Sequence, residues 1–273
     1  MKWLAAFLAT LFALIPSASP LFPPENQSPT AEILYATPRI DGVLDEEYTQ
    51  SHFYAIRRGE HLNYGGAAAE AMMAETYGTT YYLHDEDYLY ICAVVHDETI
   101  VSLGENWRYS TTWPWNDDGA ELYVSYGKTA EINGKTETVG FAVHIDAFGY
   151  RAVVDEVIWG DNHATKKQYH NAPFADYAVS RPEENVYIVE IRFALDEGMG
   201  VGSTVGGFLE IDDRFSPEAL SNSAEKTVIG ARFPMPRDPW RPEFQAVLSE
   251  RRAVPAEDPF ELYAFEMAAS ILP

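Results

Sequence analysis

Residues Thr79-Thr-Tyr-Tyr-Leu83, His84-Asp-Glu-Asp87 and Tyr88-Leu-Tyr-Ile-Cys-Ala-Val-Val-His96 predict a strand, a turn and a second strand in direct succession. Both faces of the second strand are apolar, with Leu89, Ile91, Ala93 and Val95 on one side and Tyr90, Cys92 and Val94 on the other. A strand that is apolar on both faces is covered on both sides. We therefore expect an inner strand of a layered fold.

Short strands also dominate the rest of the chain. Further runs rich in β-branched and aromatic residues are Gly119–Tyr126, Gly140–Asp146, Tyr150–Val154, Tyr177–Ser180, Val186–Phe193, Val205–Ile211, Thr227–Gly230 and Gln245–Ser249. Turn signals separate them, namely Asn133-Gly134, Phe148-Gly149 and Glu183-Glu-Asn185. Because helical periodicity is scarce, we predict an all-β protein, an antiparallel β-sandwich of immunoglobulin-like or jelly-roll-like type.

Composition narrows the classes of partner. Apolar residues make up 47% of the 273 residues and aromatic residues 14%, which is enough to fill a large core. Nineteen basic residues against 42 acidic ones give a formal net charge of −23. So negative a chain is repelled by nucleic acid and by anionic membrane surfaces, and we expect neither as a partner.

The N-terminus is typical of a secretory signal peptide. Lys2 gives the positive end, Trp3–Ile15 the apolar core and Pro16–Ser19 the small-residue cleavage region. The apolar core is too short to span a membrane. We expect residues 1–19 to be removed, residues 20–30 to be a proline-rich linker, and the mature protein to be secreted or periplasmic without a lipoprotein cysteine. The domain is then expected over residues 31–250, with a C-terminal tail over residues 251–273.

Two interpretations are open for Trp113-Pro-Trp-Asn-Asp-Asp-Gly-Ala-Glu-Leu-Tyr-Val124, in which aromatic residues and carboxylates precede a predicted strand. Indole rings beside fixed carboxylates suit a sugar, which has apolar C–H faces and a rim of hydroxyl groups. Alternatively, the tryptophans cover the core and the aspartates begin the strand. Cys92 is the only cysteine and lies in an apolar run, so we expect a buried, unreactive thiol.

Several motifs in order resemble carbohydrate-binding module family 9, within the broader group of DOMON-like β-sandwiches. The matching pieces are Ile40-Asp-Gly-Val-Leu-Asp45, Tyr82-Leu-His-Asp-Glu-Asp-Tyr-Leu-Tyr90, Trp115-Asn-Asp-Asp-Gly-Ala-Glu121, Tyr187-Ile-Val-Glu-Ile191 and Gly206-Gly-Phe-Leu-Glu-Ile-Asp-Asp213. The resemblance covers about residues 31–250. It implies a non-catalytic module that holds the end of a plant-wall type polysaccharide between two tryptophans.

The resemblance also implies the site residues. Trp115 matches the first tryptophan of the family, and Trp240, in Arg237-Asp-Pro-Trp-Arg-Pro242, is similar to the second. Glu121 and Arg151 match a glutamate and an arginine of the binding face, and Glu210 stands where the family carries a glutamine, followed by Asp212 and Asp213. Glutamate in place of glutamine removes a donor, which changes the hydroxyl group that position 210 can serve.

Two departures from the family pattern affect this site. The order of residues around Trp240 is shifted, and the segment 157–175, with Trp159, His163, Lys166 and Lys167, is an insertion that can cover the site. The family's modules are typically joined to plant-wall hydrolases, so the resemblance suggests a glycoside hydrolase as the partner. We expect this hydrolase to be a separate protein.

A structural calcium ion is a further implication of the family. Carboxylates in the two acidic turns supply the hard oxygen ligands that calcium prefers, namely Asp85, Glu86, Asp87, Asp97 and Glu98. A solvated acidic turn is the competing interpretation. The helix–loop–helix calcium pattern is absent from the sequence.

Other classes of function depend on particular residues. A DOMON-type haem or redox module would need axial ligands, for which His96, His144 and Met199 are the candidates, and we expect no haem. A protein-interaction module of an extracellular glycan-utilisation system could use the same face. The sequence carries neither a Gly-x-Ser-x-Gly motif nor a His-Glu-x-x-His motif, so we do not expect an enzyme.

Overall fold

The computed structural model describes residues 31–57, 62–63, 75–101, 117–150, 152–159, 164–170, 175–214, 226–230, 239–240 and 242–254. In these ranges the strands are β1 (Glu32–Tyr35), β2 (Phe53–Ile56), β3 (Leu62–Asn63), β4 (Tyr77–His84), β5 (Tyr88–His96), β6 (Gly119–Ser125), β7 (Thr129–Ile132), β8 (Lys135–Asp146), β9 (Ala152–Trp159), β10 (Ala164–His170), β11 (Ala175–Glu183), β12 (Val186–Ala194), β13 (Thr204–Arg214), β14 (Lys226–Gly230) and β15 (Gln245–Arg252). The helix α2 (Glu46–Thr49) and the 3-10 turn η5 (Pro242–Phe244) accompany them.

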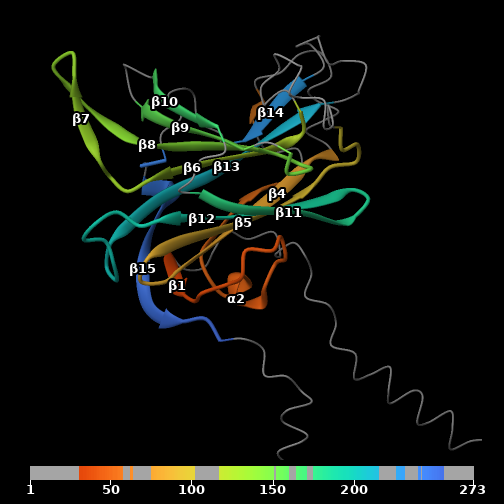
Figure 1. The fold of residues 1–273 in the computed structure, drawn as a ribbon, viewed down its shortest axis with the longest axis horizontal. Helices are drawn as coiled ribbons and strands as arrows, with labels where there is room; N and C mark the ends of the chain where they lie inside the picture. The colour runs from red at the N-terminus through yellow and green to blue at the C-terminus, as the bar shows by residue number, and fades with distance from the viewer. Residues whose placement is uncertain are drawn as a thin grey trace, which may run out of the picture.

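One continuous sheet folds over to make two layers (Figure 1). Its strand order is β10-β9-β8-β6-β13-β15-β1-β4-β5-β12-β11. We call β10-β9-β8-β6-β13 the β6 layer and β4-β5-β12-β11 the β5 layer, and β15 and β1 join them. Strands are antiparallel within each layer, whereas β1 runs parallel to both β15 and β4. The all-β sandwich that the sequence predicts is therefore confirmed.

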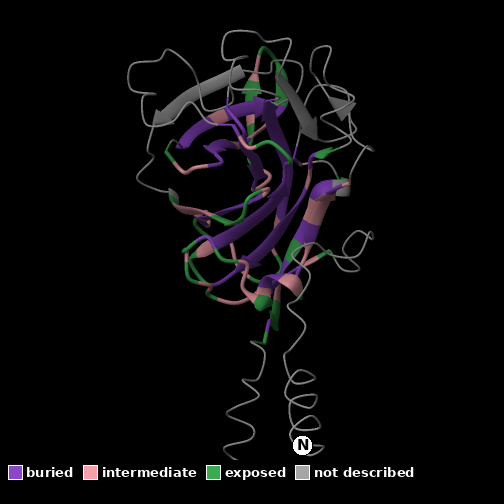
Figure 2. Ribbon diagram, turned by 90° about the vertical axis from the view of Figure 1, so that its right-hand side faces the viewer, coloured by how far each residue is buried: buried purple, intermediate pink, exposed green. Residues whose placement is uncertain are grey.

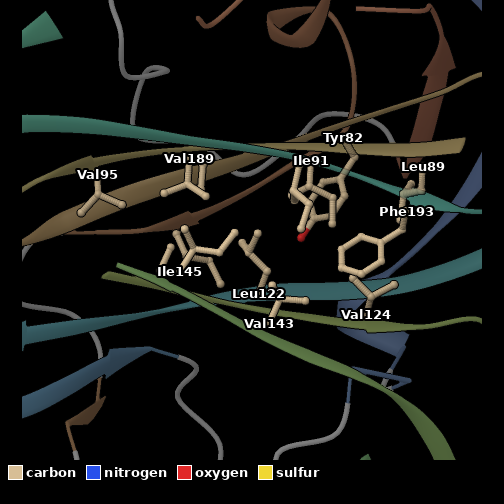
Figure 3. Close-up of a cluster of buried hydrophobic side chains, with 14 of the residues drawn as sticks. Tyr82, Leu89, Ile91, Val95, Leu122, Val124, Val143, Ile145, Val189 and Phe193 are labelled. Carbon is tan, nitrogen blue, oxygen red and sulfur yellow. The ribbon is translucent and has the colours of Figure 1, made fainter. Parts of the chain in front are cut away.

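The main core lies between the two layers (Figure 3). Alternate residues of β5 and β12 face alternate residues of β6, β8 and β13; among them are Ile91, Val95, Val189, Leu122, Val143, Ile145 and Leu209. Each of these side chains is at most 1% exposed. Every second side chain of these strands points into the core, and the burial of this apolar surface holds the two layers together.

The outer face of the β5 layer carries a second apolar cluster, so β5 is buried on both faces as its sequence predicts. Tyr90, Cys92 and Val94 lie there, packed against Tyr48 of α2 and Phe53 of β2. Figure 2 shows the resulting buried strands in purple. Burial raises the pKa of the Cys92 thiol well above its ordinary value, which agrees with an unreactive cysteine.

A buried glutamate ties the N-terminal segment to this face. The carboxylate of Glu190, on β12, accepts the backbone N–H groups of Asp41 (2.9 Å) and Gly42 (3.0 Å) and the hydroxyl of Tyr48 (2.9 Å). Glu190 itself is fully buried. Two of the motifs quoted above, around Asp41-Gly42 and around Glu190, are therefore two halves of one structural contact.

The structure contains more strands than the sequence predicted, and its fold continues past the predicted C-terminal boundary. Strands β1, β2, β3, β7 and β10 were not expected, and β10 lies in the segment 157–175 interpreted as an insertion. Strand β15 continues to Arg252, and Ala253 packs in the outer cluster of the β5 layer, so the fold reaches beyond residue 250. The signal and linker, residues 1–30, lie outside the described residues. None of the described helices is both long and apolar enough to cross a membrane.

Candidate functional site

A strip of ionisable side chains crosses the outer face of the β6 layer. Strand alternation points Leu122, Val143 and Leu209 into the core, so the residues next to them point outwards. The strip formed in this way consists of Glu121 on β6, His144 on β8, Asp155 on β9, and Glu210 and Asp212 on β13. All five are at most 8% exposed. We call this set the acidic strip.

Close contacts link the members of the acidic strip. Nδ1 of His144 lies 3.2 Å from Oε1 of Glu121, and its Nε2 lies 3.8 Å from Oδ2 of Asp155. Glu121 also accepts the hydroxyl of Tyr123 at 2.7 Å, and it is the direct cross-strand partner of Glu210. Oδ1 of Asp155 is buried and has no hydrogen-bond partner in the described ranges. The strip thus concentrates oxygen acceptors on one face, which suits a ligand rich in O–H donors.

An aromatic cluster adjoins the acidic strip. The rings of Tyr123 and Phe208 stack with centroids 4.5 Å apart, and Phe244 packs on Phe208 at 4.8 Å. Tyr54 meets Phe244 edge to face at 5.4 Å, and burial together with the nearby Glu210 raises the pKa of its hydroxyl. These rings are not among the site residues that the sequence predicts. Their strand alternation with Glu121 and Glu210 is the signal that places Tyr123 and Phe208 on the same face.

Trp240 lies on this face but at the far end of β6 from Glu121. Its six-membered ring covers Gly127: a Cβ on that glycine would lie 2.5 Å from Cζ2 of the indole. The backbone before it crosses Gly206, whose Cβ would lie 2.1 Å from the carbonyl oxygen of Pro239. Gly127 is six positions after Glu121, a span of up to about 20 Å along a strand. Trp240 therefore packs on the β6–β7 turn, and its contact with a sugar stays a prediction.

Asp213 does not belong to the acidic strip. It alternates with Asp212 on β13 and faces the other side, where it is grouped with Asp97 and Asp118. Trp115 and Arg151 lie outside the described residues, as do Trp107, Trp113 and His163. Of the six predicted sugar-binding residues, the structure thus brings Glu121 and Glu210 together and places Trp240 and Asp213 elsewhere.

The acidic turn at residues 85–87 is closed by hydrogen bonds. Oδ1 of Asp85 accepts the N–H groups of Asp87 and Tyr88, and Oδ2 accepts the hydroxyls of Tyr90 and Thr37. These bonds lower the pKa of Asp85 although burial opposes them. These hydrogen bonds close the turn. Within the described ranges, Asp97 is the suggested calcium ligand that lies in a group of three carboxylates, with Asp118 and Asp213.

The two histidines considered as haem ligands have protein neighbours in different layers. His96 stacks on Tyr77, with its Nε2 2.7 Å from Nδ2 of Asn185 and its Nδ1 3.3 Å from the carbonyl of Glu75. His144 lies in the β6 layer between two carboxylates. Met199 packs against the edge of the main core.

A family model described as carbohydrate family 9 binding domain-like matches residues 40–231, about 70% of the chain (192 of 273 residues). This chain belongs to that family. No protein with a curated description matches it. The resemblance stated from the motifs is therefore confirmed, and the family's region includes both Glu190 with its Asp41-Gly42 turn and the whole acidic strip.

Solved structures with the same fold include modules of this family. A carbohydrate-binding module family 9 from Caldicellulosiruptor kristjanssonii in complex with cellotriose is similar at 17% identity and a TM-score of 0.51, covering 84% of this chain and 98% of that one. The same kind of module in complex with glucose has 15% identity and a TM-score of 0.49, covering 83% and 98%. The first of these similarities supports the β-sandwich fold of the family 9 chain.

Proposed function

We propose that this family 9 chain is a carbohydrate-binding module that holds a glycan on the outer face of the β6 layer without cleaving it. The observation that carries the proposal is the acidic strip, which places Glu121 and Glu210 side by side within the region that matches the family. The similar module from Caldicellulosiruptor kristjanssonii is described in complex with cellotriose, which supports a saccharide as the ligand.

Each part of the proposed site has a physical task. Carboxylates accept hydrogen bonds from sugar hydroxyls more strongly than neutral oxygens do, and this is the task of Glu121 and Glu210. Arg151 would donate to two neighbouring oxygens. Trp115, six residues before Glu121, would stack on the apolar face of the sugar ring, a contact worth about 1 kcal/mol at roughly 25 cal/mol per Å². Trp240 would form the second stacking surface.

Burial of the acidic strip sets a condition on binding. Glu210 is fully buried and Glu121 is 3% exposed, so a sugar hydroxyl must replace a present neighbour before it reaches either carboxylate. Tyr54, whose hydroxyl lies near Glu210, is one such neighbour. Because the ligand has to displace existing contacts and lose its own freedom, we expect a Kd between about 1 μM and 1 mM.

The preferred glycan and its setting extend the same proposal. We infer that the ligand is the end of a plant-wall type polysaccharide, that residues 1–19 direct export, and that a separate glycoside hydrolase acts on the same polymer. An end-binding module gains nothing from added sugar units once its site is filled. Affinity that stops rising after two or three units is therefore the expected pattern.

Calorimetric titration of the mature chain with xylo-, cello- and manno-oligosaccharides tests the proposal. We expect saturable heat with one series, loss of at least tenfold in affinity for Trp115→Ala and Glu210→Gln, and recovery of the oligosaccharide uncleaved. Asp176→Asn is the matched control, because this exposed carboxylate lies on β11 in the other layer and pairs with Arg192. Thermal unfolding of each variant shows whether its fold is intact.

Other results would lead to different functions. Absence of heat with every oligosaccharide series would exclude carbohydrate as the ligand. A protein would then be the expected partner of the same face. Loss of binding in Asp176→Asn as large as in Glu210→Gln would place the site away from the acidic strip. Shortened oligosaccharide after incubation would make the chain a hydrolase.

A further inference from the structure

A histidine and two carboxylates from three neighbouring strands meet within the acidic strip. Glu121 on β6 is the direct cross-strand partner of both His144 on β8 and Glu210 on β13, and Asp212 lies two residues beyond Glu210. Glu121, His144 and Asp212 each offer one ligand atom, and these atoms all lie within 4.8 Å of one another. All three side chains are buried. The pairing of the strands thus builds a compact group with one nitrogen donor and two oxygen donors.

The imidazole of His144 has a carboxylate on each side. Its Nδ1 lies 3.2 Å from Oε1 of Glu121, and its Nε2 lies 3.8 Å from Oδ2 of Asp155. The other oxygen of Glu121, Oε2, accepts the hydroxyl of Tyr123 at 2.7 Å. Histidines that bind a metal through one nitrogen commonly direct the other nitrogen to a carboxylate, which fixes the ring and makes the ligand more basic. Asp155, His144 and Glu121 have this order.

Asp155 gives an independent indication that this group binds a ligand. Its side chain is only 6% exposed, and its Oδ1 meets no hydrogen-bond donor among the described residues. Its Oδ2 is too far from His144 for a hydrogen bond. A buried carboxylate in these surroundings is costly. A cation on Nδ1 of His144 would keep the proton of the ring on Nε2, where it faces Asp155, and would strengthen that donor.

We propose that Glu121, His144 and Asp212 bind one zinc ion. Zinc accepts mixed nitrogen and oxygen ligands, whereas calcium and magnesium prefer oxygen ligands. Two ligand atoms on a tetrahedral zinc ion are roughly 3.4 Å apart at bond lengths of about 2.1 Å. The 3.2 Å between Nδ1 of His144 and Oε1 of Glu121 is close to this spacing. One neutral imidazole and two carboxylates also balance the charge of the ion, and three protein ligands leave the fourth position for a water molecule.

The zinc site is distinct from the other group of buried carboxylates. Asp97, Asp118 and Asp213 offer oxygen alone, and strand alternation places Asp213 on the opposite face of β13 from Asp212. The zinc ion would instead join β8, β6 and β13, which are neighbours in the sheet. Glu121 belongs both to this site and to the proposed carbohydrate site, but zinc binding requires no sugar.

Thermal unfolding of the full chain, carrying no histidine tag and freed of metal with EDTA, tests the site. ZnCl2 is added in an excess of CaCl2, because calcium occupies sites made of oxygen alone and leaves the zinc response to groups that contain an imidazole. At a zinc concentration about one hundred times Kd, we expect Tm to rise by about 5–10 °C. Elemental analysis after dialysis should find one zinc ion per chain.

Variants distinguish a metal ligand from a structural contact. By competition with a chromogenic chelator, His144→Gln and Asp212→Asn should bind zinc about a hundredfold more weakly or worse, and Asp155→Asn about tenfold more weakly, because Asp155 is a positioning residue. His96→Gln is the matched control: this histidine also lies 3.8 Å from a carboxylate, that of Glu98, but it belongs to the β5 layer. It should keep the full zinc affinity.

Two further measurements keep the test decisive if a ligand variant fails to fold. The Tm of each metal-free variant reports its fold, and Asp155→Asn leaves all three ligands in place. Cobalt(II), a visible-absorbing substitute for zinc, should give the parent chain an absorption band that His144→Gln lacks and His96→Gln keeps.

The proposal is overturned if excess zinc leaves the Tm of the parent chain unchanged, since His144 would then serve as an imidazolium between two carboxylates. It is equally overturned if His144→Gln and Asp212→Asn bind zinc as tightly as the parent chain does. Every titration here omits sugar. Failure of zinc binding therefore leaves the oligosaccharide titrations unaffected, and absence of sugar binding leaves the zinc site standing.

Discussion

Buried glutamates on the two outer faces of the sandwich have different surroundings. On the β5 layer, the Glu190 carboxylate accepts hydrogen bonds from three donors of the N-terminal segment, so it acts as an anchor. On the β6 layer, Glu121 and Glu210 are cross-strand neighbours within a strip that also contains two aspartates and a histidine. A single acid surrounded by donors stabilises a fold, whereas several acids side by side cost stability unless another molecule or ion offsets their charge.

Removing the charge of Glu190 should produce the largest loss of stability. Glu190→Gln keeps the shape but turns an acceptor oxygen into an amide that faces existing donors. We expect the free energy of unfolding to fall by about 3 kcal/mol, since buried donors that lose an acceptor cost about 1–3 kcal/mol each. Urea denaturation measures it. Tyr48→Phe, which removes one of the donors, should cost about 1 kcal/mol. A loss under about 0.5 kcal/mol for Glu190→Gln would mean that the anchor is dispensable.

The packing of Trp240 gives the second prediction, at the far end of the outer face. Gly127→Ala would push a methyl group against the indole at 2.5 Å, on a backbone with φ of 71°. Gly134 is the matched control, because its φ is 76° and nothing lies within 4 Å of its Cβ position. We expect losses of about 2 kcal/mol for Gly127→Ala and about 1 kcal/mol for Gly134→Ala.

Near-ultraviolet circular dichroism and oligosaccharide titration extend that comparison of glycines. A changed aromatic signal in Gly127→Ala alone would show that the indole has moved. If Trp240 stacks on the sugar, the same variant should bind oligosaccharide more weakly than Gly134→Ala. Equal affinities would restrict Trp240 to packing on the β6–β7 turn.

The sequence predicted the layered fold well because strand periodicity is a local property. Because Tyr88–His96 is apolar on both faces, the sequence predicted packing on both, and each face lies in an apolar cluster of the structure. The turn predicted at Asn133-Gly134 is also present. It joins β7 and β8 in a hairpin, with φ values of 52° and 76°. Strands β1 and β2 were missed because each has four residues and gains its stability from pairing with distant strands.

The candidate site was harder to predict because its residues come from strands far apart in the chain. Motif matching found Glu121 and Glu210, which lie opposite each other on β6 and β13. It missed His144 and Asp155 as members of the strip, because only pairing of β8 with β6 and β9 brings them beside Glu121. It also grouped Asp213 with Glu210, although strand alternation places these two carboxylates on opposite faces.

The smallest expected effect comes from Asp155→Asn on the acidic strip. One oxygen of Asp155 has no hydrogen-bond partner among the described residues, and the other lies 3.8 Å from His144, too far for a hydrogen bond. The change therefore alters one long contact with His144 and removes a buried acidic group, and the free energy of unfolding should shift by less than about 1 kcal/mol. Urea denaturation beside Glu190→Gln makes the measurement. A loss equal to that of Glu190→Gln would show that the acids of both faces anchor the fold, and the contrast between the faces would no longer indicate a binding site.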